Sequence, residues 1–450
     1  MDNLFGRTQI FTDAEEITTE NVLSVLESAS RVHQQNVDQI EYLWNYYKGK
    51  QPILERIKEI RPEINNMIVE NRAKEIVDFK VGYLVGEPIQ YVGRGDADTE
   101  RINLLNDMML LQDKESQDGD LATWQMICGT SYRGVFPGEE GEIFNSYSID
   151  PRQAFVVYSS GIDKSPVLGG YLVVDSENNT HYTLYTKDLR FRILNLDTIE
   201  EVSPHFIGRI PIIEYPANSA RLGAFEPVLT LLDAINTVDS NRVDGIEQFI
   251  QSLIVCINCE FSEGTTAGSI MQQGMVKLRS IDGMTQDIKI LSEQLNQSET
   301  EIAKSDMYNA VLTICMMPNR NGGSSTSDTG IAVIYRDGWE AAESSAKKQE
   351  TIWKKSERQF LRVVQSICDT VGGLSFNAGE IDIKFTRRNY ENIQSKAQVL
   401  TQMLDNAKID PKLAFIYSNM FPDPEEAYKM SLPYIKASTE TSEDTTGREA

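Results

Sequence analysis

Cysteine and histidine are scarce in this sequence, which holds five cysteines and three histidines among its 450 residues. Five cysteines over such a length do not make the disulfide framework of a small secreted protein. Cys256 and Cys259 form one CxxC pair, but a zinc site takes four ligands and no second pair follows at a finger-like spacing. We therefore expect no metal site, two thiols at buried strand edges, and core positions for Cys128, Cys315 and Cys368.

Long apolar runs are also missing. The longest stretches, such as residues 210–213 and 253–257, are far shorter than the roughly 20 residues that a membrane-spanning helix needs. The first residues are acidic and lack the basic start and apolar core of a signal peptide. With 40% hydrophobic and 24% charged residues, the composition is that of an ordinary soluble protein with several domains. We expect a protein made and used in a cytoplasm, without a membrane partner.

Basic residues are fewer than acidic residues in this sequence. The chain has 43 Lys and Arg against 67 Asp and Glu, which gives a formal net charge of −24. A protein that grips DNA by neutralising phosphates needs a basic surface, so tight general DNA binding is not expected. The acidic surface has two interpretations, plain solubility or a wall that DNA passes without sticking, and composition does not choose between them.

The common catalytic motifs are absent from the sequence. It contains no GxxxxGK[ST] phosphate loop, no HExxH and no GxSxG. Gly93-Arg94-Gly95 is too short for a dinucleotide fingerprint. We expect no enzyme activity and no cofactor. The abundant carboxylates alone do not exclude a metal-dependent nuclease.

The first half of the sequence predicts helices followed by a β-rich region. Apolar residues at steps of three and four predict a helix from Val37 that ends at Gly49, and a second helix over 67–85. A strand at 89–92 and further helices over 101–111 and 121–128 follow. From 131 to 215 the period changes to two, with short strands separated by Gly, Asn, Asp and Pro.

The second half predicts long helices. A helix over 226–254 would span about 45 Å, and a second over 293–316 could run antiparallel to it, with a small β-containing knob between them. A Gly- and Ser-rich loop then precedes a helical pattern over 329–371 that would reach about 65 Å, with Gly338 as a possible bend. A strand at 381–385 and helices over 393–406 and 424–434 precede a polar tail.

Several stretches in this order resemble the portal proteins of tailed bacteriophages, particularly the type common in siphophages of Gram-positive hosts. The resemblance covers about residues 46–434, and it is carried by the order of the stretches, since no single motif is specific. The stretches are Tyr46-Tyr47-Lys48-Gly49, Asn65-Asn66, Asn71, Ile76-Val77-Asp78, Gly82-Tyr83-Leu84-Val85-Gly86-Glu87-Pro88-Ile89, Gly208-Arg209-Ile210-Pro211-Ile212-Ile213-Glu214-Tyr215, Leu232-Asp233-Ala234, Met317-Pro318-Asn319 and Gly330-Ile331-Ala332.

The resemblance implies an α+β portal fold with an α/β wing, long stem helices, a small β-containing clip, a long helix crossing the wing and a helical crown. The implied boundaries, in chain order, are 1–223 for the wing, 224–254 for stem helix 1, 255–291 for the clip, 292–317 for stem helix 2, 318–328 for the tunnel loop, 329–372 for the long wing helix, 373–390 for a wing strand, 391–436 for the crown and 437–450 for a disordered tail. The short crown departs from the longest members of the family.

The implied function is that of a portal, or head-to-tail connector: a ring at one capsid vertex through which DNA is packaged and ejected. Twelve subunits are expected in the virion, and assembly is expected in the host bacterial cytoplasm. The expected partners are the terminase large subunit, major capsid and scaffolding proteins, head-completion or adaptor proteins, and double-stranded DNA that passes without sequence specificity. The alternatives are another virion structural protein, such as a capsid-associated adaptor, and behind it a metal-dependent DNA enzyme.

Three groups of residues are candidate functional sites. The mobile polar loop is expected to face DNA and comprises Asn319, Arg320, Asn321, Gly322, Gly323, Ser324, Ser325, Thr326, Ser327 and Asp328. Acids that could line the channel are Asp239, Asp244, Glu247, Glu299, Glu301 and Asp306, and the competing interpretation is a solvated outer face or pairing. Partner docking at the clip is assigned to Thr265, Thr266, Met271, Gln272, Gln273 and Met275. For Arg242 and Lys304, pairing between helices is expected over contact with phosphate.

Overall fold

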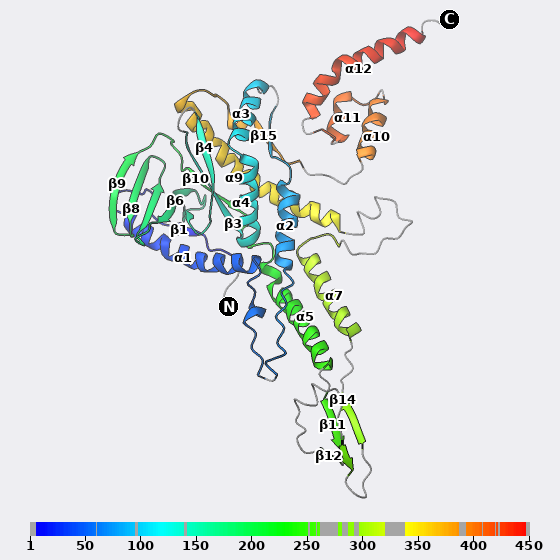
Figure 1. Cartoon of the computed structure of the whole chain (residues 1–450). Coiled ribbons are helices and arrows are strands. Elements are labelled where there is room, and N and C mark those ends of the chain that lie inside the picture. Colours follow the sequence, from blue (N-terminus) through cyan, green and yellow to red (C-terminus); the bar gives the residue numbers. More distant parts are fainter. Residues whose placement is uncertain are drawn as a thin grey trace. The chain divides into compact units, whose positions relative to one another are not determined.

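The computed structural model describes residues 6–59, 61–94, 98–138, 142–250, 253–257, 259–261, 278–280, 287–291, 297–319, 338–386, 393–406, 408–418, 420–421 and 424–446. The chain divides into two compact units (Figure 1). Unit 1 contains residues 1–48, 72–228 and 312–450, and unit 2 contains residues 49–71 and 229–311. Both units draw on segments far apart in the sequence. The mixture of helices and sheets confirms the α+β prediction.

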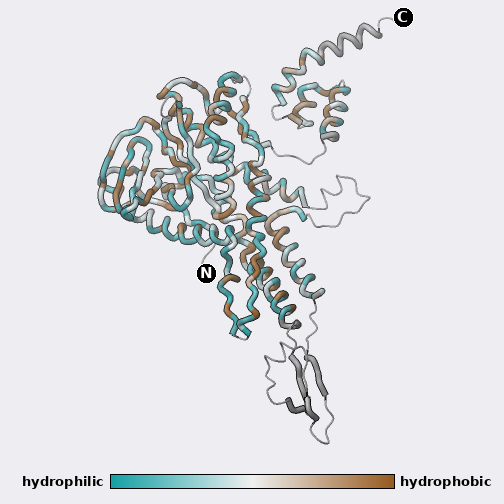
Figure 2. Tube along the Cα trace, in the orientation of Figure 1, coloured by the Kyte–Doolittle hydropathy of each residue, from teal (hydrophilic) through white to brown (hydrophobic). Residues whose placement is uncertain are grey.

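A six-stranded sheet forms one part of unit 1. Its strands, in spatial order, are β1 (Ile10–Thr12), β5 (Ala154–Ser159), β6 (Pro166–Val174), β7 (Thr180–Tyr185), β8 (Leu189–Leu194) and β9 (Thr198–Pro204). Only the β1–β5 pair is parallel, because the other neighbours are joined by short turns. Figure 2 shows hydrophobic and hydrophilic residues along these strands. The apolar face packs on helix α1 (Val22–Tyr47), with Leu26 and Phe155 fully buried.

The β-rich region predicted for residues 131–215 is therefore confirmed, and it also supplies a second sheet. That sheet is antiparallel, with the order β10 (Ile212–Pro216), β3 (Thr130–Pro137) and β4 (Phe144–Ile149). Strand β3 is buried along most of its length, because helix α4 (Lys114–Cys128) and helix α9 (Trp339–Val371) both pack against it. Cys128, Cys315 and Cys368 are buried as predicted.

Helix α1 ends where the sequence predicted, since Lys48 caps it and Gly49 has a φ of +92°. It begins at Val22, much earlier than the predicted Val37. Two further helices, α2 (Arg72–Val85) and α3 (Thr99–Leu111), flank the short strand β2 (Gln90–Gly93). Strand β15 (Ile381–Lys384), which comes nearly 300 residues later, pairs with β2 in the register Ile383 to Tyr91. The late strand thus joins the C-terminal part of unit 1 to its N-terminal part.

Helix α9 has one buried face and one exposed face. Its buried residues include Trp353, Phe360, Val364 and Ile367. Gly338, which the sequence marked as a possible bend, has a φ of +82° and directly precedes the first residue of α9; the predicted helical residues 329–337 lie outside the described residues. A left-handed residue interrupts regular helical geometry, and glycine adopts this conformation at little cost.

The C-terminal segment consists of three helices instead of the predicted two. They are α10 (Ile393–Leu404), α11 (Pro411–Ser418) and α12 (Pro424–Thr446). Phe415 of α11 stacks on Phe421 and contacts Tyr428 of α12. The predicted disordered tail at 437–450 is helical up to Thr446. Polar composition indicated disorder, but no proline or glycine interrupts the chain between Pro433 and Thr446.

Unit 2 is built on two helices with β-strands between them in the sequence. The helices are α5 (Leu229–Ile250) and α7 (Gln297–Ile314), and a short 3₁₀ turn, Glu226–Val228, precedes α5. The strands are β11 (Leu253–Ile257), β12 (Cys259–Phe261), β13 (Leu278–Ser280) and β14 (Asp287–Leu291). They form two antiparallel pairs, β11 with β14 and β12 with β13. The predicted β-containing knob is found, but the helix before it ends at Ile250 and not at Ile254.

A cluster of buried charges holds α9 in unit 1. The Glu357 carboxylate accepts hydrogen bonds from the Tyr91 hydroxyl at 2.5 Å and the Tyr215 hydroxyl at 2.8 Å. The Lys114 ammonium lies 2.9 Å from Glu357 and 2.6 Å from Asp118, which also pairs with Arg133 at 2.5 Å. Two cations and two anions therefore balance, and all four side chains are at most 4% exposed.

The electrostatics of this cluster favour an ionised Glu357. Burial by itself would raise the pKa of the carboxyl, but Lys114, Arg133 and the Tyr91 hydroxyl outweigh burial and bring the pKa down to about 2. Burial and the Glu357 charge raise the pKa of Tyr91 and Tyr215 well above the ordinary value, so both hydroxyls stay protonated donors.

We expect Glu357→Gln to destabilise unit 1 by about 3–5 kcal/mol, because it leaves Lys114 and Arg133 buried with one anion. Glu350→Gln, on the same helix, removes a partly exposed i,i+4 pair with Lys354 and should cost about 1 kcal/mol or less. Urea unfolding followed by tryptophan fluorescence measures both, since all four tryptophans lie in unit 1. Equal losses in the two variants would contradict the assigned role.

The pH dependence of stability tests the charge of Glu357, with wild type and Glu357→Gln as the two proteins compared. Because the folded pKa of Glu357 is about 2 and its ordinary value is 4.5, its stabilisation is complete above that ordinary value and is lost as the pH falls toward 2. The stability gap between wild type and Glu357→Gln should therefore be smaller at acidic pH than at neutral pH. A gap of the same size at both pH values would show that the carboxylate is not ionised in the fold.

Candidate functional site

Residues 49–71 form a strap that lies along helix α5 within unit 2 (Figure 1). Three backbone amides of the strap donate to three side chains on one face of the helix. The bonds are Asn66 N–H to Asp244 Oδ1 at 2.7 Å, Ile68 N–H to Ser240 Oγ at 3.0 Å and Glu70 N–H to Asn236 Oδ1 at 2.8 Å. Four helical residues rise about 6 Å and two extended residues about 6.6 Å. Because these two distances are nearly equal, every second amide of the strap lies beside the next turn of α5.

Asp244 is the most heavily used acceptor of this ladder. Besides Asn66, its carboxylate binds the Lys58 ammonium at 2.7 Å and the Arg56 guanidinium at 3.2 Å, and its side chain is 5% exposed. Burial raises the pKa of Asp244, but Lys58 and the Asn66 donors outweigh burial and hold the pKa below its ordinary value. The carboxylate is therefore an ionised anchor for the strap.

Helices α5 and α7 are ion-paired to one another. Arg242 of α5 lies 2.5 Å from Glu301 of α7, and Lys304 of α7 lies 2.9 Å from Asp239 of α5. Because the second pair lies earlier on α5 and later on α7, the helices run antiparallel, as the sequence suggested. Lys304 also reaches Glu70 of the strap at 2.6 Å. The prediction that Arg242 and Lys304 pair between helices is confirmed.

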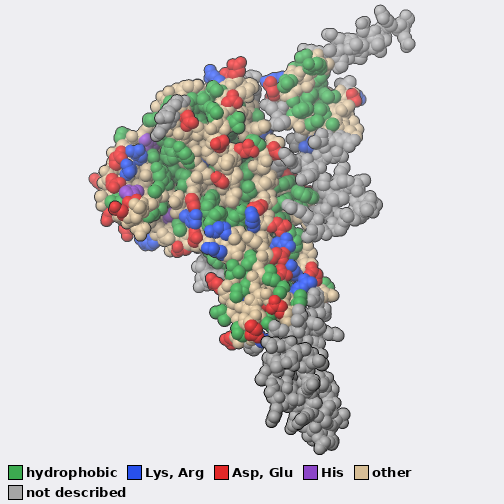
Figure 3. All heavy atoms as spheres, in the orientation of Figure 1, with side chains coloured by type: hydrophobic (Ala, Val, Ile, Leu, Met, Phe, Trp, Pro, Cys, Tyr) green, Lys and Arg blue, Asp and Glu red, His purple; other side chains and the backbone are tan. Residues whose placement is uncertain are grey.

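The six candidate channel acids therefore separate into different environments. Asp239 and Asp244 are buried and ion-paired within the unit, as in the competing interpretation of pairing, and their place in a channel wall stays a prediction. Glu301 is exposed but paired with Arg242. Glu247 is half-buried, and Glu299 and Asp306 are exposed. Figure 3 shows acidic and basic side chains interspersed along the helices of this unit.

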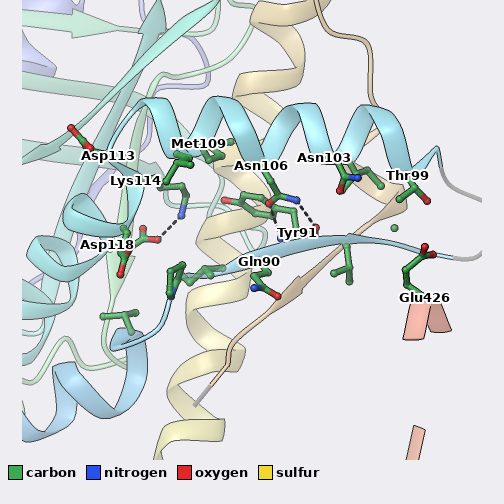
Figure 4. Close-up of a pocket in the computed structure, with 18 of the residues that line it drawn as sticks. Gln90, Tyr91, Thr99, Asn103, Asn106, Met109, Asp113, Lys114, Asp118 and Glu426 are labelled. Carbon is green, nitrogen blue, oxygen red and sulfur yellow. Dashed lines mark hydrogen bonds and ion pairs between the residues drawn. The ribbon is translucent and has the colours of Figure 1, made fainter. Parts of the chain in front are cut away.

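A cavity of about 920 Å³ lies in unit 1. Strand β2 and helices α3 and α4 line much of it, and Figure 4 shows Asn106, Lys114 and Asp118 pointing toward it. These polar groups are already bonded within the fold. Asn106 bonds the backbone of Tyr91 at both its N–H and C=O, and Lys114 and Asp118 belong to the Glu357 cluster.

Two absences among the described residues bear on the site. No group of three or more His, Cys, Asp or Glu is placed to hold a metal ion there. Of the helices in the described part of the chain, none has the length and hydropathy that a membrane span requires.

Comparison with known proteins gives the family. The family model for phage portal proteins of the SPP1 Gp6-like type matches residues 27–431. The chain belongs to this family. A curated relative, the portal protein of Bacillus phage SPP1, is 21% identical over 394 residues, which cover 80% of this chain and 75% of that protein.

Solved structures related to this portal chain share little sequence with it. A chain from the neck of an empty GTA particle, computed with C6 symmetry, is 12% identical with a TM-score of 0.48 and covers 78% of this chain and 90% of that chain. A chain from the neck of a native GTA particle, computed with C12 symmetry, is 11% identical with a TM-score of 0.45 and the same coverage.

Most of the loop and clip residues predicted for this portal protein lie outside the described residues. Of the predicted DNA-facing loop, Asn319 is described and half-buried, and residues 320–328 are not described. The six clip residues, Thr265, Thr266, Met271, Gln272, Gln273 and Met275, are not described either. Their assigned roles stay predictions. The strands Leu253–Ile257 and Asp287–Leu291 bound the clip segment on both sides.

The sequence reasoning missed the strap and its ladder in this portal chain. A usable signal was present, because Asn236, Ser240 and Asp244 are three polar residues spaced by four on a helix with an apolar pattern. Such a row predicts a polar partner along the helix. It does not reveal that the partner is backbone from residues 66–70.

We expect Asp244→Ala to loosen the strap, because the Asn66 amide and Lys58 lose their acceptor, at a cost of about 1–3 kcal/mol. The matched control is Asp306→Ala, which removes an exposed acid of α7. Hydrogen–deuterium exchange of the amides at 66–70 measures the effect, and about 1.4 kcal/mol corresponds to tenfold faster exchange. Unchanged exchange in Asp244→Ala, or equal acceleration in both variants, would show that the ladder does not hold the strap.

Proposed function

We propose that this portal protein assembles as a ring, of twelve subunits in the virion, at one vertex of a phage capsid. The ring serves as the conduit for DNA packaging and ejection. Family membership over residues 27–431 supports this proposal. The observation that carries it is the antiparallel pair α5 and α7, tied together by Arg242–Glu301 and Lys304–Asp239 and carrying a β-containing segment between them.

In the proposed assignment, α5 and α7 are the stem and residues 255–291 are the clip. The β-rich part of unit 1 is the wing, which α9 crosses, and α10 to α12 form the crown. The strap fits this assignment because it braces the stem through Asp244 and Lys304 without covalent linkage. A braced helix pair transmits force from a docked motor better than two separate helices would.

The clip is proposed to dock the terminase large subunit during packaging and head-completion or adaptor proteins afterwards, and the ring to contact capsid and scaffolding proteins at assembly. The chain is proposed to have no enzyme activity of its own. The sequence lacks the phosphate-loop motif that nucleotide-driven translocation uses, so the energy for DNA movement comes from the partner ATPase.

Native mass spectrometry and negative-stain imaging of the purified full-length chain test the ring. We expect closed particles of about a dozen subunits with a central hole, because most soluble homo-oligomers have closed symmetry. Monomers or dimers that persist when scaffolding and capsid proteins are added would overturn the proposal and favour the capsid-associated adaptor.

The loop at 319–328 is proposed to regulate passage of DNA at the narrowest part of the channel. Deletion of Gly322–Ser327 should leave ring formation intact and reduce the DNA packaged or retained in particles, because the shortened loop no longer reaches the duplex. The control replaces the same six residues with an alternating Gly-Ser sequence, which keeps length and flexibility. DNA content per particle is the measurement, and normal content in the deletion variant would remove the loop's role.

A further inference from the structure

The exposed face of helix α9 carries a cationic stripe. We use this name for Lys347, Lys348, Lys355, Arg358 and Arg362, all of which are exposed. Steps of seven, three and four residues from Lys348 place Lys355, Arg358 and Arg362 on one side of the helix, and Lys347, next to Lys348, lies at the edge of that side. This side is opposite the face that buries Trp353 and Phe360. From Lys347 to Arg362 the stripe is about 22 Å long at 1.5 Å per residue.

Acidic residues are excluded from the stripe. On this side of α9 they occur only beyond its ends, at Glu340 and Asp369. Glu343 and Glu350 lie at its flank, where they pair with Lys347 at 3.5 Å and with the neighbouring Lys354 at 2.6 Å. In the part of the chain that the structure describes, no ion pair is found for Lys348, Lys355, Arg358 or Arg362. These four cations therefore leave a local positive charge on a chain whose formal charge is −24.

The stripe continues into a small cavity of about 300 Å³. Arg362, Arg209 and Lys187 all line this cavity. Its one acidic lining residue, Glu214, is occupied by Arg221 at 2.6 Å. The loop that carries Arg209 is fixed against α9, because the Ser366 hydroxyl donates to the Ile207 carbonyl at 2.5 Å and Gly208 turns the chain with a φ of +65°. Arg209 and Arg362 are therefore held at one end of the stripe.

The composition of the surface indicates what binds to it. A protein interface takes its affinity mainly from aromatic and aliphatic side chains buried at its centre. Within α9, no large hydrophobic side chain is exposed before Val371. The stripe instead presents Lys and Arg, with Thr351 between them and Ser344 one turn before Lys347, which are the residue types that contact phosphate oxygens of nucleic acids. A polyanion with regularly spaced charges fits such a surface better than another protein does.

We propose that the cationic stripe of α9 binds the phosphate backbone of double-stranded DNA without sequence specificity. The length of the stripe corresponds to about six base-pair steps at 3.4 Å. Rigid helix packing through Glu357 and Trp353 fixes the spacing of the cations, so binding costs little backbone ordering. The proposal uses duplex DNA as the cargo of the proposed portal function, and it adds a contact outside the predicted tunnel loop.

The test is binding of the full-length assembled protein to a fluorescent 30-base-pair duplex, measured by anisotropy across a series of salt concentrations. The stripe variant is Lys355→Gln with Arg358→Gln and Arg362→Gln. The control variant is Lys164→Gln with Arg192→Gln and Lys408→Gln, which removes three exposed cations elsewhere and changes the net charge equally. If three phosphates are lost, the slope of log affinity against log salt should fall by about 2.7 for the stripe variant, and the control should keep the wild-type slope.

Each outcome decides the proposal. A loss of affinity confined to the stripe variant supports it. Equal losses of affinity in both variants would show an effect of net charge only. Wild-type rings that do not bind the duplex would overturn the proposed DNA binding by the stripe but would not contradict the proposed ring assembly. If the stripe variant binds DNA normally but no longer forms rings, the surface is a contact between subunits and the proposal is wrong. Wild-type protein that forms no ring would instead count against the proposed portal assembly, and its DNA affinity would still be read out.

Discussion

The buried carboxylate of Glu357 is the point on which the arrangement of unit 1 depends. It gathers hydroxyls from β2 and β10 and an ammonium from α4 around one turn of α9. An ionised group in a protein interior has to be compensated by directed partners, because its desolvation costs several kcal/mol. The partners are available only when α9 is rotated and positioned so that Glu357 faces inward. The apolar contacts of Trp353 and Phe360 alone would tolerate small rotations more readily.

That constraint has a consequence on the opposite face of the same helix. With Glu357 and Trp353 fixed inward, Lys355, Arg358 and Arg362 must face outward, held at a constant spacing. The net charge of the chain predicts repulsion of DNA, whereas the stripe provides local attraction. Over separations longer than a Debye length of about 8–10 Å, surface charges are screened, so a local cluster can differ in sign from the chain as a whole. A portal subunit with a negative net charge can therefore carry a local surface that is positively charged.

Unit 2 is held together by a different kind of interaction. Its helix α5 holds the strap by offering side-chain acceptors to backbone amides, with Asn236, Ser240 and Asp244 acting like the acceptors of a neighbouring strand. The pairing works because the rise of one helical turn is close to the advance of two extended residues. It also removes Asp239 and Asp244 from the solvent-facing acids, and it leaves Glu299 and Asp306 as exposed acids of α7. The acidity of a segment is thus a poor guide to the charge of its surface.

The sequence by itself determined the family, the α+β class, the long helices and the β-rich middle region, because these follow from local periodicity and from the order of short stretches over most of the chain. It also identified the pairing of Arg242 and Lys304. Tertiary structure decided the start of α9 at Gly338, the helical continuation to Thr446, the burial of Asp239 and Asp244, the strap and the Glu357 cluster. Pairs such as Tyr91 with Glu357, or Asn66 with Asp244, join residues more than 170 positions apart. A local pattern gives the face on which a side chain lies, but the partner that meets that face is set by the packing of distant segments.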